Sequence, residues 1–290
     1  MTPEAAAEQR CYRHPDRDAY ISCQRCERLI CPDCMRDAAV GFQCPACIAE
    51  GRKSVRAART MAGGAVSSSV GTVSMVLIGI NVLAYLMQLA TGGFDGGIFR
   101  QGAMLAETRF ASDGTQLTGV VDGAWWRLLT AAFLHGGLLH LAFNMYALYL
   151  FGPYVEKAFG TWRFVVAYLS MAVFSSVVVY VLSPAGTPTV GASGAIFGLF
   201  ALTLVLQTKA KIDVRSLLVL LGINAVLSLR ANISWQGHLG GFVAGLLLGA
   251  AVAYSPKQYR QQAQIGAFAL LLVVAVVAMW LRSDALVTRP

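Results

Sequence analysis

Long apolar runs without charged side chains are the feature that most restricts how this 290-residue chain folds. The stretches Phe164 to Leu182 and Ile265 to Leu281 contain no charged residue. Runs of about 17–25 apolar residues are long enough to cross the hydrocarbon core of a bilayer, which is about 30 Å thick. Only 13% of all residues are charged, whereas a soluble domain carries about a quarter. The sequence therefore predicts an all-α polytopic membrane protein.

Seven apolar segments can be interpreted as membrane-crossing helices. They fall at about Thr72–Ala90, Leu128–Phe151, Phe164–Leu182, Gly194–Gln207, Leu217–Leu229, Leu239–Tyr254 and Ile265–Leu281. The fifth is the shortest of them, with only 13 residues, and it contains Asn224. We expect six helices to form a core over residues 71–256, and a seventh helix and a tail to occupy residues 257–290.

Basic residues lie in every second connection between these segments. After the basic stretch before the first segment, they recur at Lys157 and Arg163, from Lys209 to Arg215, and at Lys257 and Arg260. Because short cytoplasmic loops are enriched in Lys and Arg, we expect a cytoplasmic N-terminus. The other ends of the helices then open to the extracytoplasmic side. This placement explains the net charge of +8 better than nucleic-acid binding, which we do not expect.

All seven cysteines lie between Cys11 and Cys47, ahead of the apolar segments. With His14 they form four pairs whose members are separated by two residues: Cys11/His14, Cys23/Cys26, Cys31/Cys34 and Cys44/Cys47. Two such pairs complete one tetrahedral zinc site, so eight ligands suit two zinc ions. A reducing cytoplasm also favours metal over disulfides. We expect a double zinc-binding module over residues 1–49 and a basic, flexible linker over residues 50–70.

The spacing of the pairs resembles that of B-box-type zinc fingers, most specifically in the CPDC and CPAC sequences. In that family the pairs interleave. The resemblance thus implies one ion held by Cys11, His14, Cys31 and Cys34 and another held by Cys23, Cys26, Cys44 and Cys47. Spacing alone leaves open sequential pairing, and also a single zinc site with spare thiols. The ions would be structural, because so short a unit cannot build much core. A protein partner for this module is a hypothesis.

A few ionisable or amide side chains occur inside the apolar segments, where they are costly and indicate function. His135, His140 and Asn144 fall in the second predicted segment, and His238 opens the sixth. His140 and Asn144 are four residues apart and therefore share one helix face. These four residues are the first candidates for a site within the membrane.

Two stripes of glycine predict which helices pack together. They are Gly237, Gly241, Gly245 and Gly249 in the sixth segment, and Gly194 and Gly198 in the fourth. Such stripes let helix backbones approach closely, and their packing would bring Ser193 close to His238. A neutral imidazole can take the proton of a serine hydroxyl. His140 and Asn144 could then stabilise the oxyanion of an acyl-transfer intermediate.

Five short motifs in this part of the chain resemble those of the rhomboid family. They are Gly191-Ala192-Ser193-Gly194 (GxSG), His135 to Asn144 (HxxxxHxxxN), Trp126-Arg127 (WR), His238 to Gly245 (HxxGxxxG), and the acidic-plus-glycine element Glu156 with Gly160. The resemblance covers about Gly71 to Tyr254, and the motifs occur in family order. It implies a rhomboid-like six-helix bundle followed by one extra C-terminal transmembrane helix.

The resemblance also implies an activity, that of an intramembrane serine endopeptidase with a Ser–His dyad and an acyl-enzyme. Ser193 would attack the scissile carbonyl, and His238 would act as general base and then as general acid. His140 and Asn144 would donate hydrogen bonds to the oxyanion, with help from the backbone N–H of Ser193. Catalysis would need no cofactor.

Two further positions carry weaker implications. His135 would be a supporting residue near the entry of water. Phe197 stands where the family often has a tyrosine, so its ring could stack on His238 but could not donate a hydrogen bond. This departure concerns the orientation of the base and leaves the dyad itself in place.

The implied substrates are transmembrane proteins, cleaved in or near their membrane segments within the lipid bilayer. Six helices plus one, with compact loops, indicate a bacterial plasma membrane. The alternative is a catalytically silent rhomboid-like protein that binds membrane clients. Loss of Ser193 or of His238 would favour this alternative, and both residues are present. A transporter or proton channel would predict inverted repeats or paired acidic residues within spans, and neither is evident.

Overall fold

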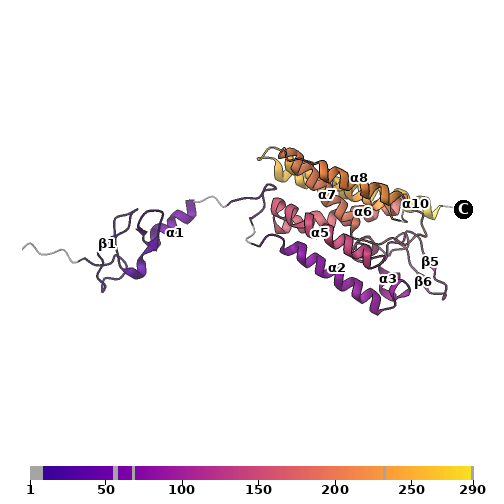
Figure 1. Ribbon diagram of the computed structural model, residues 1–290, viewed down its shortest axis with the longest axis horizontal. Helices are drawn as coiled ribbons and strands as arrows, with labels where there is room; N and C mark the ends of the chain where they lie inside the picture. Colours follow the sequence, from indigo (N-terminus) through magenta and orange to yellow (C-terminus); the bar gives the residue numbers. More distant parts are fainter. Residues whose placement is uncertain (1–8, 55–57, 67–68, 231–232, 289–290) are drawn as a thin grey trace, which may run out of the picture. The chain divides into compact units, whose positions relative to one another are not determined.

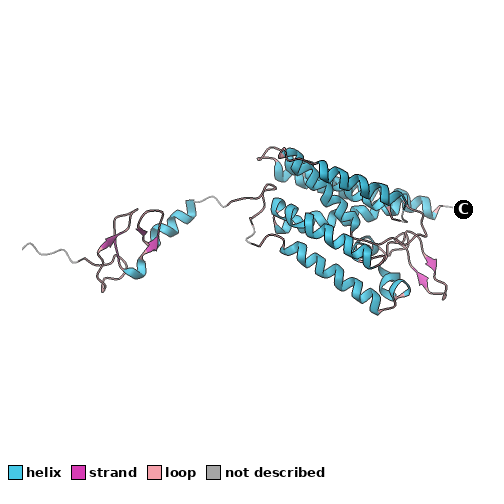
Figure 2. Cartoon of the chain, in the orientation of Figure 1, coloured by secondary structure: helices cyan, strands magenta, loops and turns pink. Residues whose placement is uncertain are grey.

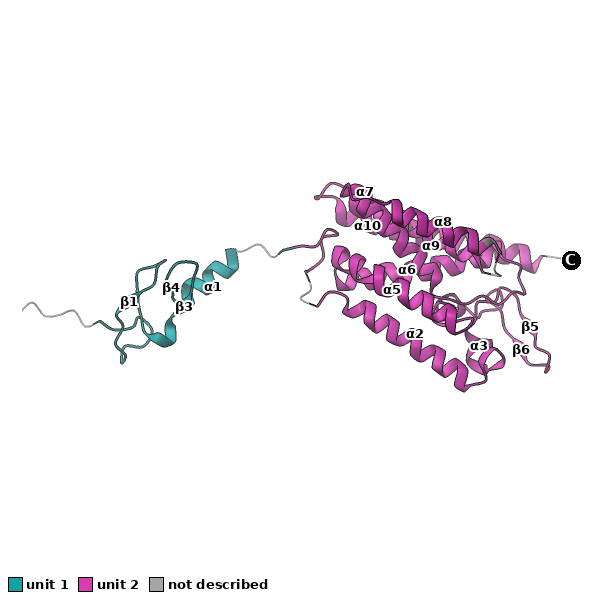
Figure 3. Cartoon of the chain, in the orientation of Figure 1, with its two compact units in different colours: residues 1–58 teal, residues 59–290 magenta. Residues whose placement is uncertain are grey.

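The computed structural model describes residues 9–54, 58–66, 69–230 and 233–288. Residues 55–57 and 67–68 of the predicted linker, and residues 231–232 between the fifth and sixth predicted segments, lie outside this description. The chain divides into two compact units, Met1–Ala58 (unit 1) and Arg59–Pro290 (unit 2), shown in two colours in Figure 3.

Unit 1 is built from two short hairpins, a helical turn and one helix (Figure 2). Strand β1 (Ile21–Ser22) pairs with β2 (Leu29–Ile30), β3 (Arg36–Asp37) pairs with β4 (Phe42–Gln43), and η1 (Pro32–Cys34) and α1 (Pro45–Ser54) complete the unit. Among its described residues, the buried ones are Ala19, Ile30 and six of the seven cysteines. Cysteines therefore make up most of the fully buried residues of this core, and the partly buried Tyr12, Leu29, Met35 and Phe42 pack against them.

Unit 2 contains the apolar helices (Figure 1). They are α2 (Thr72–Ala90), α5 (Leu138–Phe159), α6 (Thr161–Leu182), α7 (Ser193–Lys209), α8 (Arg215–Arg230), α9 (Trp235–Ala253) and α10 (Arg260–Val287). Among the described residues, five of these are long and apolar enough to cross a membrane, and α7 and α8 are shorter apolar helices. The predicted class of an all-α polytopic membrane protein with seven apolar helices is confirmed.

The second helix begins later than the sequence predicted. Two short helical turns stand where it was expected to start, α4 (Arg127–Thr130) and η3 (Ala131–Phe133). Gly137 then takes a φ of +139°, which a residue with a side chain rarely adopts, and α5 begins only at the next residue. His135 therefore precedes the helix that carries His140, and the prediction that both lie in one span was wrong.

Helices α7 and α9 make the closest contact in the unit. A methyl group added at Gly241 would lie 1.7 Å from the carbonyl oxygen of Gly194, and one at Gly245 would lie 2.2 Å from that of Gly198. No side chain fits at such distances, so backbone packs directly on backbone. This is the contact that the glycine spacing predicted.

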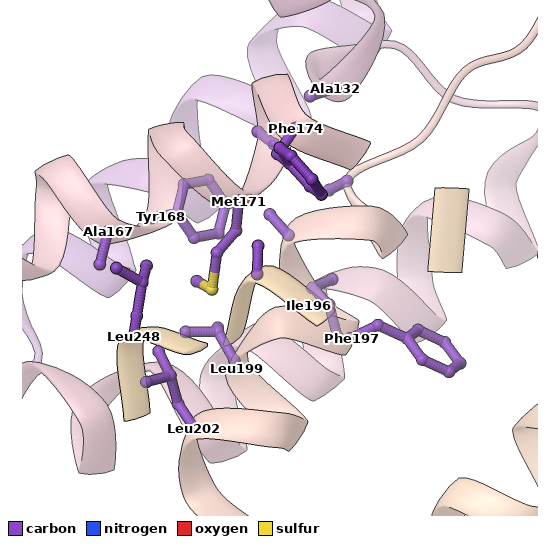
Figure 4. Packing of buried hydrophobic residues seen from close by; sticks show 14 of the residues in the cluster. Ala132, Ala167, Tyr168, Met171, Phe174, Ile196, Phe197, Leu199, Leu202 and Leu248 are labelled. Carbon is purple, nitrogen blue, oxygen red and sulfur yellow. The ribbon is translucent and has the colours of Figure 1, made fainter. Parts of the chain in front are cut away.

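Helix α7 is also enclosed by α6. Tyr168 and Met171 of α6 belong to the same buried cluster as Leu199 and Leu202 of α7 and Leu248 of α9 (Figure 4). All five side chains are almost completely shielded from solvent. The middle of α7 is thereby held between α6 and α9.

The long connection between α2 and α4 is held by one arginine. It contains η2 (Gly93–Asp95), α3 (Gly97–Gly102), β5 (Arg109–Phe110) and β6 (Gln116–Leu117). The guanidinium of Arg127, 2% exposed, donates to the carbonyls of Thr118 (2.8 Å), Ala103 (2.6 Å) and Arg100 (2.8 Å). Since buried charge is costly unless it is hydrogen-bonded, Arg127 ties three points of the loop together.

Residues 59–65, within the predicted linker, fold onto unit 2. The backbone N–H of Ala62 donates to the carbonyl of Ala158 at the end of α5 (2.9 Å). The side-chain amide of Gln264 in α10 donates to the carbonyl of Ala62 (3.0 Å). This short segment therefore joins α5 to the start of α10.

Candidate functional site

Ser193 and His238 meet at the N-terminal ends of two helices. Ser193 is the first residue of α7, and His238 lies in the first turn of α9. The distance between Ser193 Oγ and His238 Nε2 is 2.9 Å, within hydrogen-bonding range. The direct backbone contact of α7 and α9 begins at the next residue, Gly194. The hydroxyl can therefore pass its proton to the imidazole without a movement of either helix.

Phe197 holds the ring of His238 from one side. It follows Ser193 by one turn of α7, and its ring stacks on the imidazole with centroids 4.0 Å apart and planes 10° from parallel. The stacking restricts rotation of the imidazole, as the sequence suggested. An aromatic hydrocarbon leaves both ring nitrogens free for hydrogen bonds.

His140 faces the nucleophile from α5. The backbone N–H of Gly136 donates to its Nδ1 (3.1 Å), so in a neutral ring the proton is on Nε2. A methyl group added at Gly191 would lie 3.0 Å from His140 Nε2 and 3.4 Å from Ser193 Oγ. The space between these two atoms is open because Gly191 has no side chain. A donor and a nucleophile on the two sides of one small space suit a tetrahedral oxyanion.

Two further hydrogen-bond donors belong to this region. Asn144 is buried one turn after His140, and its amide nitrogen has no partner among the described residues. An unpaired buried donor is costly, which marks Asn144 as a donor available to a transient ligand. The N–H of Ser193 begins α7, where the helix offers it no carbonyl partner and the helix dipole favours negative charge.

His135 is fully buried beside His140 but does not share its helix. The two rings are 5.3 Å apart, and neither ring nitrogen of His135 has a partner in the described part of the chain. Gln88 of α2 holds its backbone from both sides, donating to the carbonyl (2.9 Å) and accepting from the N–H (3.2 Å).

Two side chains at this site were not predicted from the sequence. Gln88 is buried in the largely apolar helix α2, which also buries Asn81, and an amide at such a position was a usable signal of structural importance. Ser228, in the last turn of α8, lies 2.7 Å from Nδ1 of His238. A single serine near the end of the shortest predicted segment carried no signal that would have separated it from serines that only pack.

Unit 1 holds a second kind of site, made of two four-ligand clusters. Cys11, His14, Cys31 and Cys34 form one, and Cys23, Cys26, Cys44 and Cys47 form the other. Within each cluster the ligand atoms all lie within 4.8 Å of one another. All seven cysteines are described, and none forms a disulfide. The clusters can hold metal ions, and the pairs interleave rather than follow one another.

The similarity to known proteins lies in the part of the chain that contains the apolar helices. A family model for the rhomboid domain matches residues 122–255, a range that contains Ser193, His238, His140 and Asn144. Unit 1 lies outside that range.

Several known proteins are similar to this chain over longer or shorter stretches. Rhomboid protease GluP of Bacillus subtilis is 34% identical over 211 residues, 71% of this chain and 39% of GluP. Putative rhomboid protease YdcA of the same organism is 36% identical over 136 residues, 45% of this chain and 68% of YdcA. Rhomboid-type serine protease 2 of Emericella nidulans is 33% identical over 145 residues. The chain thus spans about two fifths of the length of GluP and about two thirds of that of YdcA.

Proposed function

This chain belongs to the rhomboid family of intramembrane proteases, and we propose that it is an active serine endopeptidase in which Ser193 and His238 form the catalytic dyad. The observation that carries the proposal is the 2.9 Å contact between Ser193 Oγ and His238 Nε2. Some rhomboid-like proteins are inactive, so the reaction is proposed from the residues of this chain.

In the proposed reaction Ser193 Oγ attacks the scissile carbonyl carbon while its proton moves to His238 Nε2. His140 Nε2, the amide of Asn144 and the N–H of Ser193 stabilise the oxyanion that forms. His238 then gives the proton to the leaving amine, and an acyl-enzyme remains. Water, deprotonated by the same imidazole, attacks the ester and releases the acid, and the proton returns to Ser193.

The proposed substrates are transmembrane proteins. A helical substrate hides its carbonyls in internal hydrogen bonds, so cleavage requires a locally extended stretch in or near the membrane segment. Ser193, His238 and His140 lie at or near the N-terminal ends of their helices. By the charge of the connecting loops these ends face the extracytoplasmic side, and the layout of six helices plus one supports a bacterial plasma membrane as the location.

For unit 1 we propose two structural zinc ions. Tetrahedral zinc, with Zn–S about 2.3 Å and Zn–N about 2.0–2.1 Å, requires S···S near 3.8 Å and S···N near 3.6 Å. The Sγ atoms of Cys26 and Cys44 are 3.8 Å apart. Nδ1 of His14 lies 3.3 Å from Sγ of Cys31, 3.5 Å from that of Cys34 and 3.9 Å from that of Cys11. These distances fit zinc, with His14 bound through Nδ1.

The test is cleavage of a fluorogenic transmembrane peptide by purified protein in detergent. Ser193→Ala and His238→Ala should each lower kcat by at least about 10⁴-fold, as for other serine–histidine pairs, with thermal unfolding unchanged. Ser176→Ala is the matched control, because Ser176 is a buried serine of α6 without a proposed role. Cleavage that persists in Ser193→Ala would contradict the dyad. No cleavage by the wild type would favour the alternative, a silent membrane-client-binding protein.

A further inference from the structure

We propose that Ser228 is a positioning residue that fixes the tautomer and the orientation of His238. This inference deepens the proposed function and rests on it, because it assigns the group that orients the proposed base. Ser228 comes from α8, so a third helix would complete the arrangement that α7 and α9 begin.

The hydrogen bonds of Ser228 determine the direction of the contact. Its side chain is buried, with 5% exposed. Its Oγ lies 2.6 Å from the backbone carbonyl of Asn224, which can only accept, and 2.7 Å from Nδ1 of His238. A hydroxyl carries one proton. Because that proton is given to the carbonyl, the proton between Ser228 and His238 belongs to the imidazole.

A proton on Nδ1 leaves Nε2 of the neutral ring as the acceptor. That is the nitrogen 2.9 Å from Ser193 Oγ, and it is the tautomer that a general base needs. Phe197, stacked on the ring, cannot make this choice because it offers no hydrogen-bonding atom. The two contacts therefore have different roles. Stacking on Phe197 restricts the plane of the ring, and the hydrogen bond with Ser228 determines which nitrogen carries the proton.

The contact should contribute more during the reaction than before it. When His238 takes the proton of Ser193, both ring nitrogens become donors and the ring carries a positive charge. Hydrogen bonds to charged groups are about twice as strong as neutral ones. Loss of the Ser228 hydroxyl should therefore raise the free energy of the transition state more than that of the enzyme–substrate complex. As a result, kcat should fall while KM remains nearly unchanged.

The experiment compares Ser228→Ala, Ser228→Thr and Ser216→Ala in the peptide-cleavage assay. Ser228→Ala should lower kcat about 10-fold, which corresponds to about 1.4 kcal/mol, with KM within about twofold. Ser228→Thr keeps the hydroxyl and should restore kcat to within about threefold of the wild type. Ser216→Ala, an exposed serine about 18 Å away along the same helix, should change neither constant.

A spectroscopic measurement separates positioning from a structural role. ¹⁵N NMR of histidine-labelled protein in micelles should show His238 with its proton on Nδ1 in the wild type, and a mixture of tautomers in Ser228→Ala. An unchanged kcat, or a reduced kcat with an unchanged tautomer, would overturn the assignment of Ser228. Neither result would contradict the proposed Ser193–His238 dyad, which is tested separately by measuring cleavage by Ser193→Ala.

Discussion

In unit 1 the side chains that can bind metal are also the core, whereas in unit 2 the reactive side chains are distinct from the residues that hold the helices together. Six of the seven cysteines are buried, with few other residues beside them. In unit 2 the α7–α9 contact is made by glycine backbones, and Ser193 and His238 sit at its end. The loss of one metal-binding side chain should therefore unfold unit 1, whereas the loss of Ser193 should remove only the activity of unit 2.

This difference follows from the size and the surroundings of each unit. A unit of about fifty residues buries little apolar surface to offset the entropy of ordering its chain, and the proposed zinc ions would supply the remainder. A helical bundle in lipid satisfies its backbone within each helix and associates through close packing. Its polar side chains are thus available for chemistry, and each can be replaced without dismantling the bundle.

The largest effect should come from removing the metal. Zinc contributes about 10–16 kcal/mol to the folding of small zinc modules, so a strong chelator should unfold unit 1 and leave unit 2 folded. Hydrogen exchange followed by mass spectrometry should show backbone protection lost over residues 9–54 and kept over α6. Cys23→Ser should lose protection over the same residues without a chelator. If protection survived both treatments, the contrast between the two units would be wrong.

A second effect should arise from the backbone contact of unit 2. Gly241→Ala puts a methyl group 1.7 Å from the carbonyl oxygen of Gly194, which must push α9 away from α7. Overpacking of this kind costs about 1–3 kcal/mol or more. Displacement of the base by about 1 Å should lower kcat by about 100-fold. Thermal unfolding and peptide cleavage measure the two effects.

The control for that substitution is Gly79→Ala in α2. A methyl group there meets no atom within 4 Å, so activity should be unchanged and stability equal or slightly higher, because alanine favours helix over glycine. Equal behaviour of the two variants would show that close backbone approach is not what holds α7 against α9.

Much of unit 2 could be predicted because its constraints are local in sequence. Apolar length located the helices, and glycine spacing located the contact that joins Ser193 to His238. The late start of α5 was missed, because Leu128 to Leu134 is as apolar as a true span and only the φ of Gly137 shows the break. Ser228 and Gln88 were missed for a different reason. Their partners lie on other elements, and no motif or spacing in the sequence links Ser228 to His238 or Gln88 to His135.

In unit 1 the spacing of the ligands predicted the pairs but left open how the pairs combine. A spacing of two residues between two ligands favours a chelating turn, whatever the position of the pair in the chain. Which turns share an ion depends on how the hairpins fold back, for example on the pairing of β1 with β2 just before Cys31. That is a property of the whole unit, and the interleaved clusters had to be seen in the structure.

The smallest of these effects should come from Glu156, where a single polar side chain of unit 2 supports the fold. Its carboxylate is buried and accepts from the N–H groups of Val73 (3.2 Å) and Ser74 (3.1 Å) and from the Ser74 hydroxyl (3.0 Å) at the start of α2. Glu156→Gln removes the charge at this helix N-terminus and one accepting oxygen. It should lower the free energy of unfolding by about 1–2 kcal/mol.

Activity should respond little to this substitution, because Glu156 is about 24 Å along α5 from His140. Lys157→Gln, an exposed neighbour, should change neither stability nor kcat. Thermal unfolding in detergent, with cleavage measured on the same samples, tests both statements. If Glu156→Gln lowered kcat by 100-fold at unchanged stability, the ends of α5 would be coupled. In that case Glu156 would support both the fold and the activity. Only the glycine contact would then remain as a part of unit 2 that holds helices together without taking part in the reaction.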